Sequence, residues 1–443
     1  MADLPKGDKK LLNAWAFYDW ANSVYSLVIS SAVFPIFYEA LFSERSHYIT
    51  VFGFSLKNSA LISFVTAFAF LVVAFISPIL SGISDYVGNK KSFMKFFCYL
   101  GALSCIGLYW FSLENIYLSL VFYFFGLVGF WGSWVFYNSY LPDIAFAEQQ
   151  DEISAKGFSY GYIGSVILLV VNLAMIMMPD AFGISGSKGE AAMKAMRYSF
   201  VMVGIWWILF SQYTYYYLPK GNKIVASKIK QHIVFNGYKE LQKVWHLLAE
   251  NEALKKYLAS FFVYSMAVQT VMLIATYFGA QEIQWASQSE STTGLIICIL
   301  LIQLVAIVGA TFTSKASAKY GNIPTLIAIN GFWVVLCVMA YFITLPIHFY
   351  VMAGLVGLVM GGIQSLSRST FAKLIPNNTT DTASYFGFYD IIEKIAITLG
   401  TFIFGFVGQF TGSMRNSVLT ILVFFIIGFV LLLRVPSKKV YHY

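Results

Sequence analysis

Twelve apolar segments of bilayer length constrain the fold of this chain more than any other feature of its sequence. A helix needs about 20 predominantly apolar residues to cross the hydrocarbon core of a membrane. Such segments lie near residues 14–42, 58–81, 93–112, 116–140, 157–178, 197–218, 256–280, 292–313, 323–344, 346–372, 383–408 and 416–434. We therefore predict an all-α membrane protein with twelve transmembrane helices.

The composition supports a membrane location. Hydrophobic residues make up 58% of the chain and charged residues only 11%, whereas soluble domains carry about 25% charged residues. So few charges cannot cover a surface that faces water, so lipid must cover much of it. The net charge of +8 would indicate nucleic-acid binding in a soluble protein. Here the basic residues lie in loops between apolar segments, and we expect no nucleic-acid partner.

The distribution of Lys and Arg predicts the orientation. If each segment crosses the membrane in the direction opposite to that of the one before, 22 of the 29 basic residues lie on the same side as the N-terminus. Six lie on the other side, and Lys394 lies within a segment. Loops rich in Lys and Arg remain in the cytoplasm. We predict a multi-pass protein of the bacterial inner (cytoplasmic) membrane with both termini in the cytoplasm.

The two halves of the chain share short matching segments. The matches are Gly88-Asn89 with Gly321-Asn322, at an offset of 233, and Pro142 with Pro376, at an offset of 234. Duplicated halves with a substrate site between them are typical of many secondary transporters. We predict two pseudo-symmetric six-helix bundles, residues 1–219 and 256–443.

A polar linker of residues 220–255 separates the two halves. It is rich in lysine, and its apolar residues recur at helical spacing at Leu241, Val244, Trp245 and Leu248. Two readings remain open: an amphipathic helix on the inner membrane surface, or a solvated tether.

The first apolar segment carries an acidic residue. A carboxylate inside a membrane is costly unless it faces a cavity or a partner. Asp19, Asn22 and Ser23 are spaced so that they share one helix face, and we assign this face, with Tyr18, to the wall of a central cavity. The alternative places Asp19 at the cytoplasmic interface.

The segment 383–408 carries Asp390, Glu393 and Lys394. Asp390 and Lys394 are four residues apart and can pair along a helix. One interpretation is a coupling-ion site or a clamp on a zwitterionic substrate. The other is a buried ion pair that fixes helix packing.

Further polar residues lie within two apolar segments: Trp134, Tyr137 and Asn138 in one, and Gln364 and Arg368 in the other. Such groups either join helices through hydrogen bonds or contact a solute. Because Arg368 lies near the end of its segment, its side chain can also extend toward the membrane–water interface. We include all five as candidates for the substrate cavity.

The loop after the second segment contains Asp85, Gly88, Lys90 and Lys91, and resembles the cytoplasmic loop motif of the major facilitator superfamily. Asp85 can accept hydrogen bonds at a helix N-terminus or pair with a cation, and Gly88 permits a tight turn. We call such a contact between the bundles a latch. A plain polar turn is the alternative. Because Ala318 stands at the matching place of the second half, the sequence predicts a latch in one half only.

No sequence motif of an enzyme is present: HExxH, GxSxG and a Walker A loop are absent, and the five histidines are scattered. We predict no catalytic residues, no metal and no cofactor. The four cysteines, Cys98, Cys105, Cys298 and Cys337, lie inside apolar segments and are expected to be small buried residues.

Three strings carry a family resemblance: YDWANS at 18–23, FYNSYLPDIA at 136–145 and GGIQSLSRS at 361–369. They resemble the "unknown major facilitator" branch of the major facilitator superfamily, which is related to the autophagy-related vacuolar amino-acid effluxers. The segment 386–394 also resembles this branch, with Lys394 at a usual basic position. The resemblance implies a rocker-switch fold and solute export or exchange.

The residues and the resemblance together predict a secondary active transporter that moves a small polar solute, such as an amino acid, by alternating access. We expect a monomer in the lipid bilayer, with protons or Na⁺ as candidate coupling ions. Two other classes stay open. A transporter of lipids or amphiphiles would have an apolar, laterally open cavity, and a non-transporting receptor would bind ligand without flux.

Overall fold

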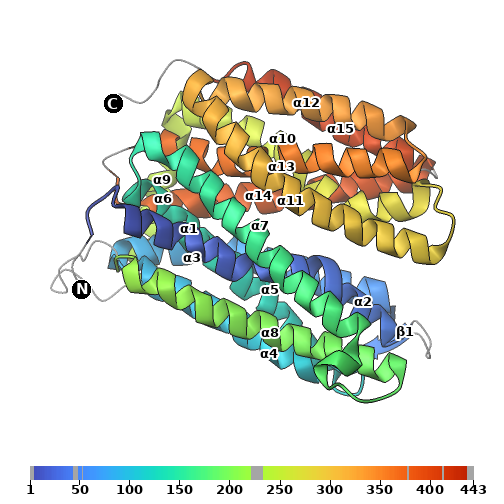
Figure 1. Ribbon diagram of the computed structural model, residues 1–443. Helices are drawn as coiled ribbons and strands as arrows, with labels where there is room; N and C mark the ends of the chain where they lie inside the picture. Colours follow the sequence, from blue (N-terminus) through green and yellow to red (C-terminus); the bar gives the residue numbers. More distant parts are fainter. Residues whose placement is uncertain are drawn as a thin grey trace.

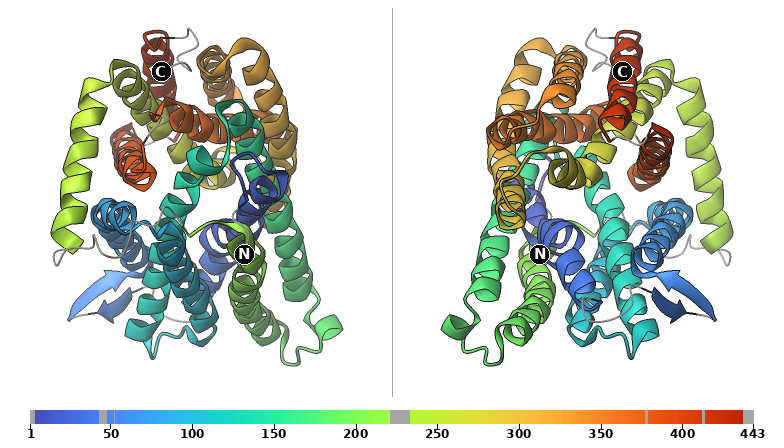
Figure 2. Two further views of the ribbon diagram at one scale, coloured as in Figure 1. Left: turned by 90° about the vertical axis from the view of Figure 1, so that its left-hand side faces the viewer. Right: turned by 90° about the vertical axis from the view of Figure 1, so that its right-hand side faces the viewer.

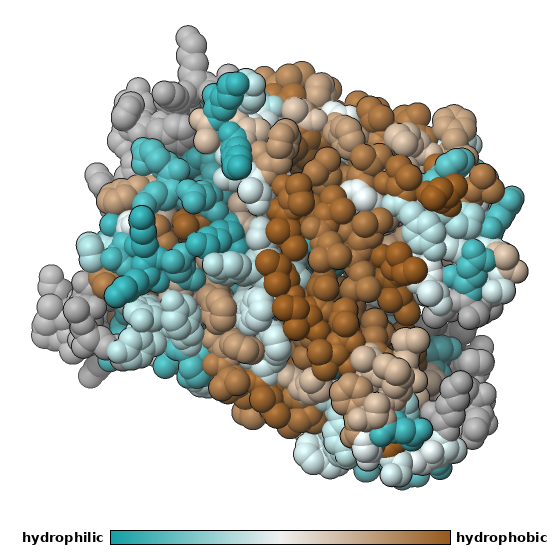
Figure 3. Space-filling model, viewed as in Figure 1, coloured by the Kyte–Doolittle hydropathy of each residue, from teal (hydrophilic) through white to brown (hydrophobic). Residues whose placement is uncertain are grey.

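The computed structural model describes residues 4–42, 48–51, 53–220, 233–376, 379–411 and 414–436. Within these ranges, 12 helices are long and apolar enough to cross a membrane, which confirms the predicted number. The helices run along a common direction in two bundles, with the N-terminal half below and the C-terminal half above in Figure 1. An apolar band crosses the middle of the face shown in Figure 3, between two more polar ends, as lipid contact requires.

The N-terminal bundle contains six spans. The first is composite, with a π-helical segment, η1 (Tyr25–Ala32), between α1 (Lys9–Val24) and α2 (Val33–Ala40). The other helices are α3 (Asn58–Val87), α4 (Lys90–Gly107), η2 (Leu108–Trp110), α5 (Ile116–Ser139), α6 (Leu141–Ile144), α7 (Ala147–Met177), η3 (Pro179–Phe182) and α8 (Lys188–Tyr217). A short antiparallel hairpin that the sequence did not predict, β1 (Tyr48–Val51) and β2 (Phe54–Lys57), pairs Tyr48 with Lys57 in the first loop.

The C-terminal bundle contains six spans, whose helices are 19 to 33 residues long. They are α10 (Glu252–Glu282), α11 (Gln288–Tyr320), α12 (Asn322–Phe342), α13 (Pro346–Leu374), α14 (Thr382–Thr411) and α15 (Met414–Leu432). Several helices extend beyond the predicted segments. The clearest case is α7, which begins at Ala147 instead of near residue 157. Hydropathy finds the part of a helix that suits lipid, but it misses polar turns that continue the helix beyond the bilayer core.

The repeated Gly-Asn pair forms the turn between the second and third spans of each bundle. Gly88 has φ of 69° and Gly321 has φ of 92°. Glycine adopts these positive values readily because it has no Cβ. The two turns therefore share a backbone requirement that explains the repeat.

The described part of the linker is a helix, α9 (Ile233–Glu250). Figure 2 shows α9 beside the two bundles, next to α3 and α14. Val244 and Leu248 are buried, and Lys243 Nζ lies 2.6 Å from Asp381 Oδ2. This segment is therefore a helix that packs against α3 and α14, and its place on a membrane surface stays a prediction. Residues 221–232 of the predicted linker lie outside the described residues.

Candidate functional site

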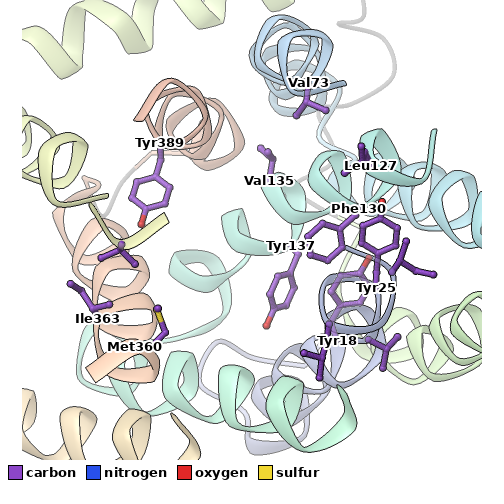
Figure 4. Close-up of a cluster of buried hydrophobic side chains, with 14 of the residues drawn as sticks. Tyr18, Tyr25, Val73, Leu127, Phe130, Val135, Tyr137, Met360, Ile363 and Tyr389 are labelled. Atoms are coloured by element: carbon purple, nitrogen blue, oxygen red, sulfur yellow. The ribbon is translucent and has the colours of Figure 1, made fainter. Parts of the chain in front are cut away.

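A cavity lies between the two bundles and takes its wall from both. It encloses about 1020 Å³, counting the space that opens to solvent. Its lining residues are Ser23, Ser26, Leu27, Phe130, Trp131, Trp134, Asn138, Phe158, Tyr162, Ser165, Phe261, Tyr264, Ser265, Val268, Gln269, Met272, Gln303, Ile363, Gln364, Ser367, Arg368, Tyr389 and Glu393. Figure 4 shows Tyr389 and Ile363 from the C-terminal bundle on one side, and Phe130 and Tyr137 from the N-terminal bundle on the other.

The first span changes helix type where it meets this cavity. Ser23 lies at the end of α1, and Ser26 and Leu27 lie in the π-helical segment. A π-helical turn is rare and often occurs at a functional site, because it redirects side chains relative to an α-helix. The hydroxyl groups of Ser23 and Ser26 give this side of the wall a polar surface.

An ion pair between the bundles borders the cavity. Arg368 Nη1 on α13 lies 3.3 Å from Asp19 Oδ2 on α1, and both side chains are buried. The Tyr137 hydroxyl donates to the same carboxylate oxygen at 2.8 Å. The other oxygen, Asp19 Oδ1, has no hydrogen-bond partner among the described residues. The pair therefore compensates the charge of Asp19 but leaves one acceptor unused.

The guanidinium of Arg368 is fully engaged by the N-terminal bundle. Its Nε donates to Ser154 Oγ at 2.9 Å, and Nη2 donates to the Ser154 carbonyl at 2.9 Å and to Asp19 at 3.3 Å. Its Nη1 donates to Asp19 at 3.3 Å and to Asn138 Oδ1 at 3.2 Å. These contacts use all five N–H donors of the group. The ring of Phe158 lies 4.3 Å from the guanidinium carbon.

Glycine makes this close packing possible. A Cβ placed on Gly157 of α7 would lie 2.5 Å from Asp19 Oδ2 and 3.1 Å from Arg368 Nη2. A side chain at this position would displace the ion pair, so the backbone of α7 can approach α1 and α13 only without one.

A second group of charges lies on α14. Asp390 Oδ1 and Lys394 Nζ are 2.9 Å apart and buried, and Lys394 Nζ lies 3.5 Å from the centre of the Trp131 ring across the bundle interface. Glu393 reaches the cavity wall, where it accepts a hydrogen bond from Gln269 Nε2 at 2.7 Å.

One end of the molecule, which we call the linker end because α9 lies there, is closed by latches. Asp85 at the end of α3 accepts hydrogen bonds from the backbone N–H groups of Ala383 and Ser384, at 3.2 and 2.7 Å, and from the Ser384 hydroxyl at 2.8 Å. A carboxylate is stabilised at a helix N-terminus such as this start of α14. The sequence predicts either hydrogen bonding at a helix N-terminus or pairing with a cation for Asp85, and the structure shows the hydrogen bonds at the N-terminus of α14.

The two lysines of the loop have different partners. Lys90 pairs with Asp143 at 2.7 Å and also contacts Thr382 of the opposite bundle. Lys91 instead donates to the Leu218 carbonyl at 2.7 Å, within its own bundle. Lys90 therefore contributes to the contact between the bundles, and Lys91 holds the N-terminal bundle together.

The prediction of a latch in one half only was wrong. A second latch joins the bundles at the α11–α12 turn. This turn lacks an acidic residue of its own, and the carboxylate comes from Asp151 at the start of α7 in the N-terminal bundle. Asp151 pairs with Lys373 at 2.6 Å, and accepts hydrogen bonds from Asn322 at 2.8 Å and Ser317 at 2.9 Å. Both charged side chains are buried.

The structure places the predicted cavity residues in three positions. Those on the wall are Ser23, Trp134, Asn138, Gln364, Arg368 and Glu393. Asp19 and Tyr137 lie behind Arg368: Asp19 pairs with Arg368, and the Tyr137 hydroxyl donates to Asp19. Those away from the wall are Tyr18, Asn22, Asp390 and Lys394. The prediction that Tyr18, Asp19, Asn22 and Ser23 all line the cavity was therefore only partly right. This part of α1 also packs within its own bundle, where the centre of the Tyr18 ring lies 5.0 Å from that of Tyr137.

Several residues that line the cavity or join the bundles escaped the sequence analysis. Gln269 and Gln303 line the cavity, and the criterion that selected Gln364, an amide inside an apolar segment, would have found both. Asp151 and Ser154 fell outside the predicted span because α7 begins earlier than its apolar part. Their role depends on contacts with α13, which no local pattern reveals.

Comparison with known proteins gives the family. Residues 7–441 match the model of the family described as "Vacuole effluxer Atg22 like". This chain belongs to that Atg22 family. It is 33% identical over 427 residues to the uncharacterized MFS-type transporter YxiO of Bacillus subtilis, covering 96% of this chain and 95% of that protein. It is 20% identical to autophagy-related protein 22-1 of Phaeosphaeria nodorum, covering 97% and 90%.

Solved structures share the fold of this Atg22-family chain. The Escherichia coli fucose:proton symporter FucP matches with a TM-score of 0.67 at 16% identity, covering 97% of this chain and 98% of that one. The proton:xylose symporter XylE matches with a TM-score of 0.68 at 14% identity, covering 97% and 96%. The chain is therefore a multi-pass membrane transporter of the major facilitator type, and not an enzyme.

Proposed function

We propose that this protein is a secondary active transporter that moves a small polar solute, such as an amino acid, across the cytoplasmic membrane by alternating access. The observation that carries the proposal is a solute-sized cavity whose wall comes from both bundles and which borders the Asp19–Arg368 pair. A rocking motion that separates the bundles on one side of such a site exposes it to one compartment at a time.

The closed linker end supports alternating access. Among the described residues, hydrogen bonds and ion pairs between the bundles lie there and around the cavity, such as Asp85–Ser384, Asp151–Lys373 and Tyr162–Gln364. Opening the linker end requires these contacts to break together. Relatives named as vacuole effluxers favour export or exchange as the direction.

The polar wall favours a polar solute over a lipid or amphiphile. Glu393, Asn138, Gln269 and Gln364 all line the cavity. Burying these groups against an acyl chain would leave hydrogen-bonding atoms unsatisfied, at a cost of about 1–3 kcal/mol each.

Proteoliposomes test the transport proposal directly. Purified protein should accelerate uptake or exchange of at least one radiolabelled solute from a panel of amino acids, amines and organic acids. Imposed proton and Na⁺ gradients should then identify the coupling ion as the one that drives uphill accumulation. Binding of a panel member without flux under any gradient would identify a receptor and overturn the proposal.

The orientation is part of the proposal: the linker end faces the cytoplasm. In intact cells, a membrane-impermeant maleimide should label Ser185→Cys, which is exposed at the opposite end before α8. It should label Glu250→Cys, exposed at the end of α9, only after permeabilisation. The native cysteines are buried and free, so their background should be low. The reverse labelling pattern would invert the topology.

A further inference from the structure

One carboxylate at the cavity wall is incompletely partnered. Glu393 Oε1 accepts the hydrogen bond from Gln269, whereas Oε2 forms an ion pair with the Lys394 ammonium at 3.8 Å, which is longer than a hydrogen bond. The Glu393 side chain keeps 14% of its surface accessible, and it faces the cavity. Glu393 therefore has an acceptor available to a solute.

The cations near the cavity are already neutralised. Arg368 pairs with Asp19 and has no N–H donor left for a solute, and Lys394 bonds to Asp390 at 2.9 Å. Three carboxylates thus face two cations, which leaves one excess negative charge when all are ionised. In a site largely removed from water, such a charge strongly favours a cationic partner.

Aromatic rings line the same cavity. Phe261, Tyr264 and Tyr389 share its wall with Glu393, and the Tyr389 ring stacks on the Phe261 ring with centroids 4.2 Å apart. Aromatic faces attract ammonium groups. The chain already shows this preference nearby, where Lys394 Nζ sits over the Trp131 ring.

We propose that Glu393 recognises a protonated amine, and that the solute is a small organic cation. A solute carboxylate would meet the negative charge of Glu393 and would find the donors of Arg368 occupied. An amine without a carboxylate should therefore bind more tightly than the corresponding amino acid or acid. The inference rests on the proposed transport function and narrows its substrate class.

A matched set of probes with one ring tests the proposal by calorimetry on the purified full chain. The probes are phenethylamine, phenethyl alcohol, phenylalanine and phenylpropionate. Phenethylamine should bind most tightly, and Glu393→Gln should weaken it about tenfold or more, the loss expected for a charged hydrogen bond removed from a buried site. The same variant should leave phenethyl alcohol binding unchanged. Glu148→Gln, which removes an exposed charge at the start of α7, is the control and should match the wild type.

Three results would overturn the amine site: phenethylamine binding that survives Glu393→Gln, phenylpropionate binding as tight as that of phenethylamine, or no phenethylamine binding by the wild type. If Glu393→Gln removes uphill flux without weakening phenethylamine, Glu393 serves the coupling ion instead, and the proposal also fails. Calorimetry reports the amine site and proteoliposome flux reports transport, so the two proposals can fail separately.

Discussion

Replacing Arg368 with methionine is expected to abolish transport and to destabilise the protein by about 3–5 kcal/mol, the usual cost of breaking a buried ion pair. The substitution leaves the Asp19 carboxylate buried against Tyr137 without a cation. It also removes the hydrogen bonds that join α13 to Ser154 and Asn138. Arg368→Lys should not restore function, because a lysine has three donors on a compact head where the site engages five. Thermal unfolding and proteoliposome flux measure both effects.

Lys256→Met is the matched control for this experiment. Lys256 also pairs with a carboxylate, Glu252 Oε2 at 3.0 Å, but the two side chains are 44% and 65% exposed and both lie on α10 of the C-terminal bundle. Exposed ion pairs contribute about 0–1 kcal/mol, so this variant should transport and should unfold near the wild-type temperature. Asp19→Asn combined with Arg368→Met should recover part of the stability but not the transport. Wild-type flux in Arg368→Met alone would exclude the pair from the mechanism.

Replacing Asp151 with asparagine is expected to open the linker end. The variant leaves the buried Lys373 ammonium without its 2.6 Å partner and weakens the link to the α11–α12 turn. A loss of about 3 kcal/mol from the closed state changes the ratio of closed to open molecules by roughly 100-fold. Spin labels at exposed positions of opposite bundles, Glu148→Cys and Lys319→Cys, should then show a population at longer distance.

Glu152→Gln provides the control for the latch. Glu152 is exposed and adjacent to Asp151 on the same helix, so its loss changes the local charge equally without touching the contact between the bundles. Its distance distribution should match that of the wild type. An unchanged distribution in Asp151→Asn would show that Asp85 and its α14 contacts keep the linker end closed by themselves.

The candidate site was predictable in kind but not in detail. Charged residues inside apolar segments cannot face lipid at low cost, and the structure buries Asp19, Asp390 and Lys394 as that argument requires. Spacing also gave the Asp390–Lys394 pair, because both residues lie on one helix. The side of the helix that meets the cavity was not predictable for Asn22, because the π-helical turn after α1 and the packing of Tyr18 depend on neighbouring helices.

By itself, the sequence determined the twelve spans, the glycine turns at 88 and 321, and the need to shield a few ionisable groups. All of these follow from local properties: hydropathy over about 20 residues, and the backbone freedom of single residues. Only the tertiary structure decided that Asp19 pairs with Arg368 and that Asp151 takes the place of an acid missing near Ala318. Those partners are far apart in the chain, and they meet because the two bundles pack face to face.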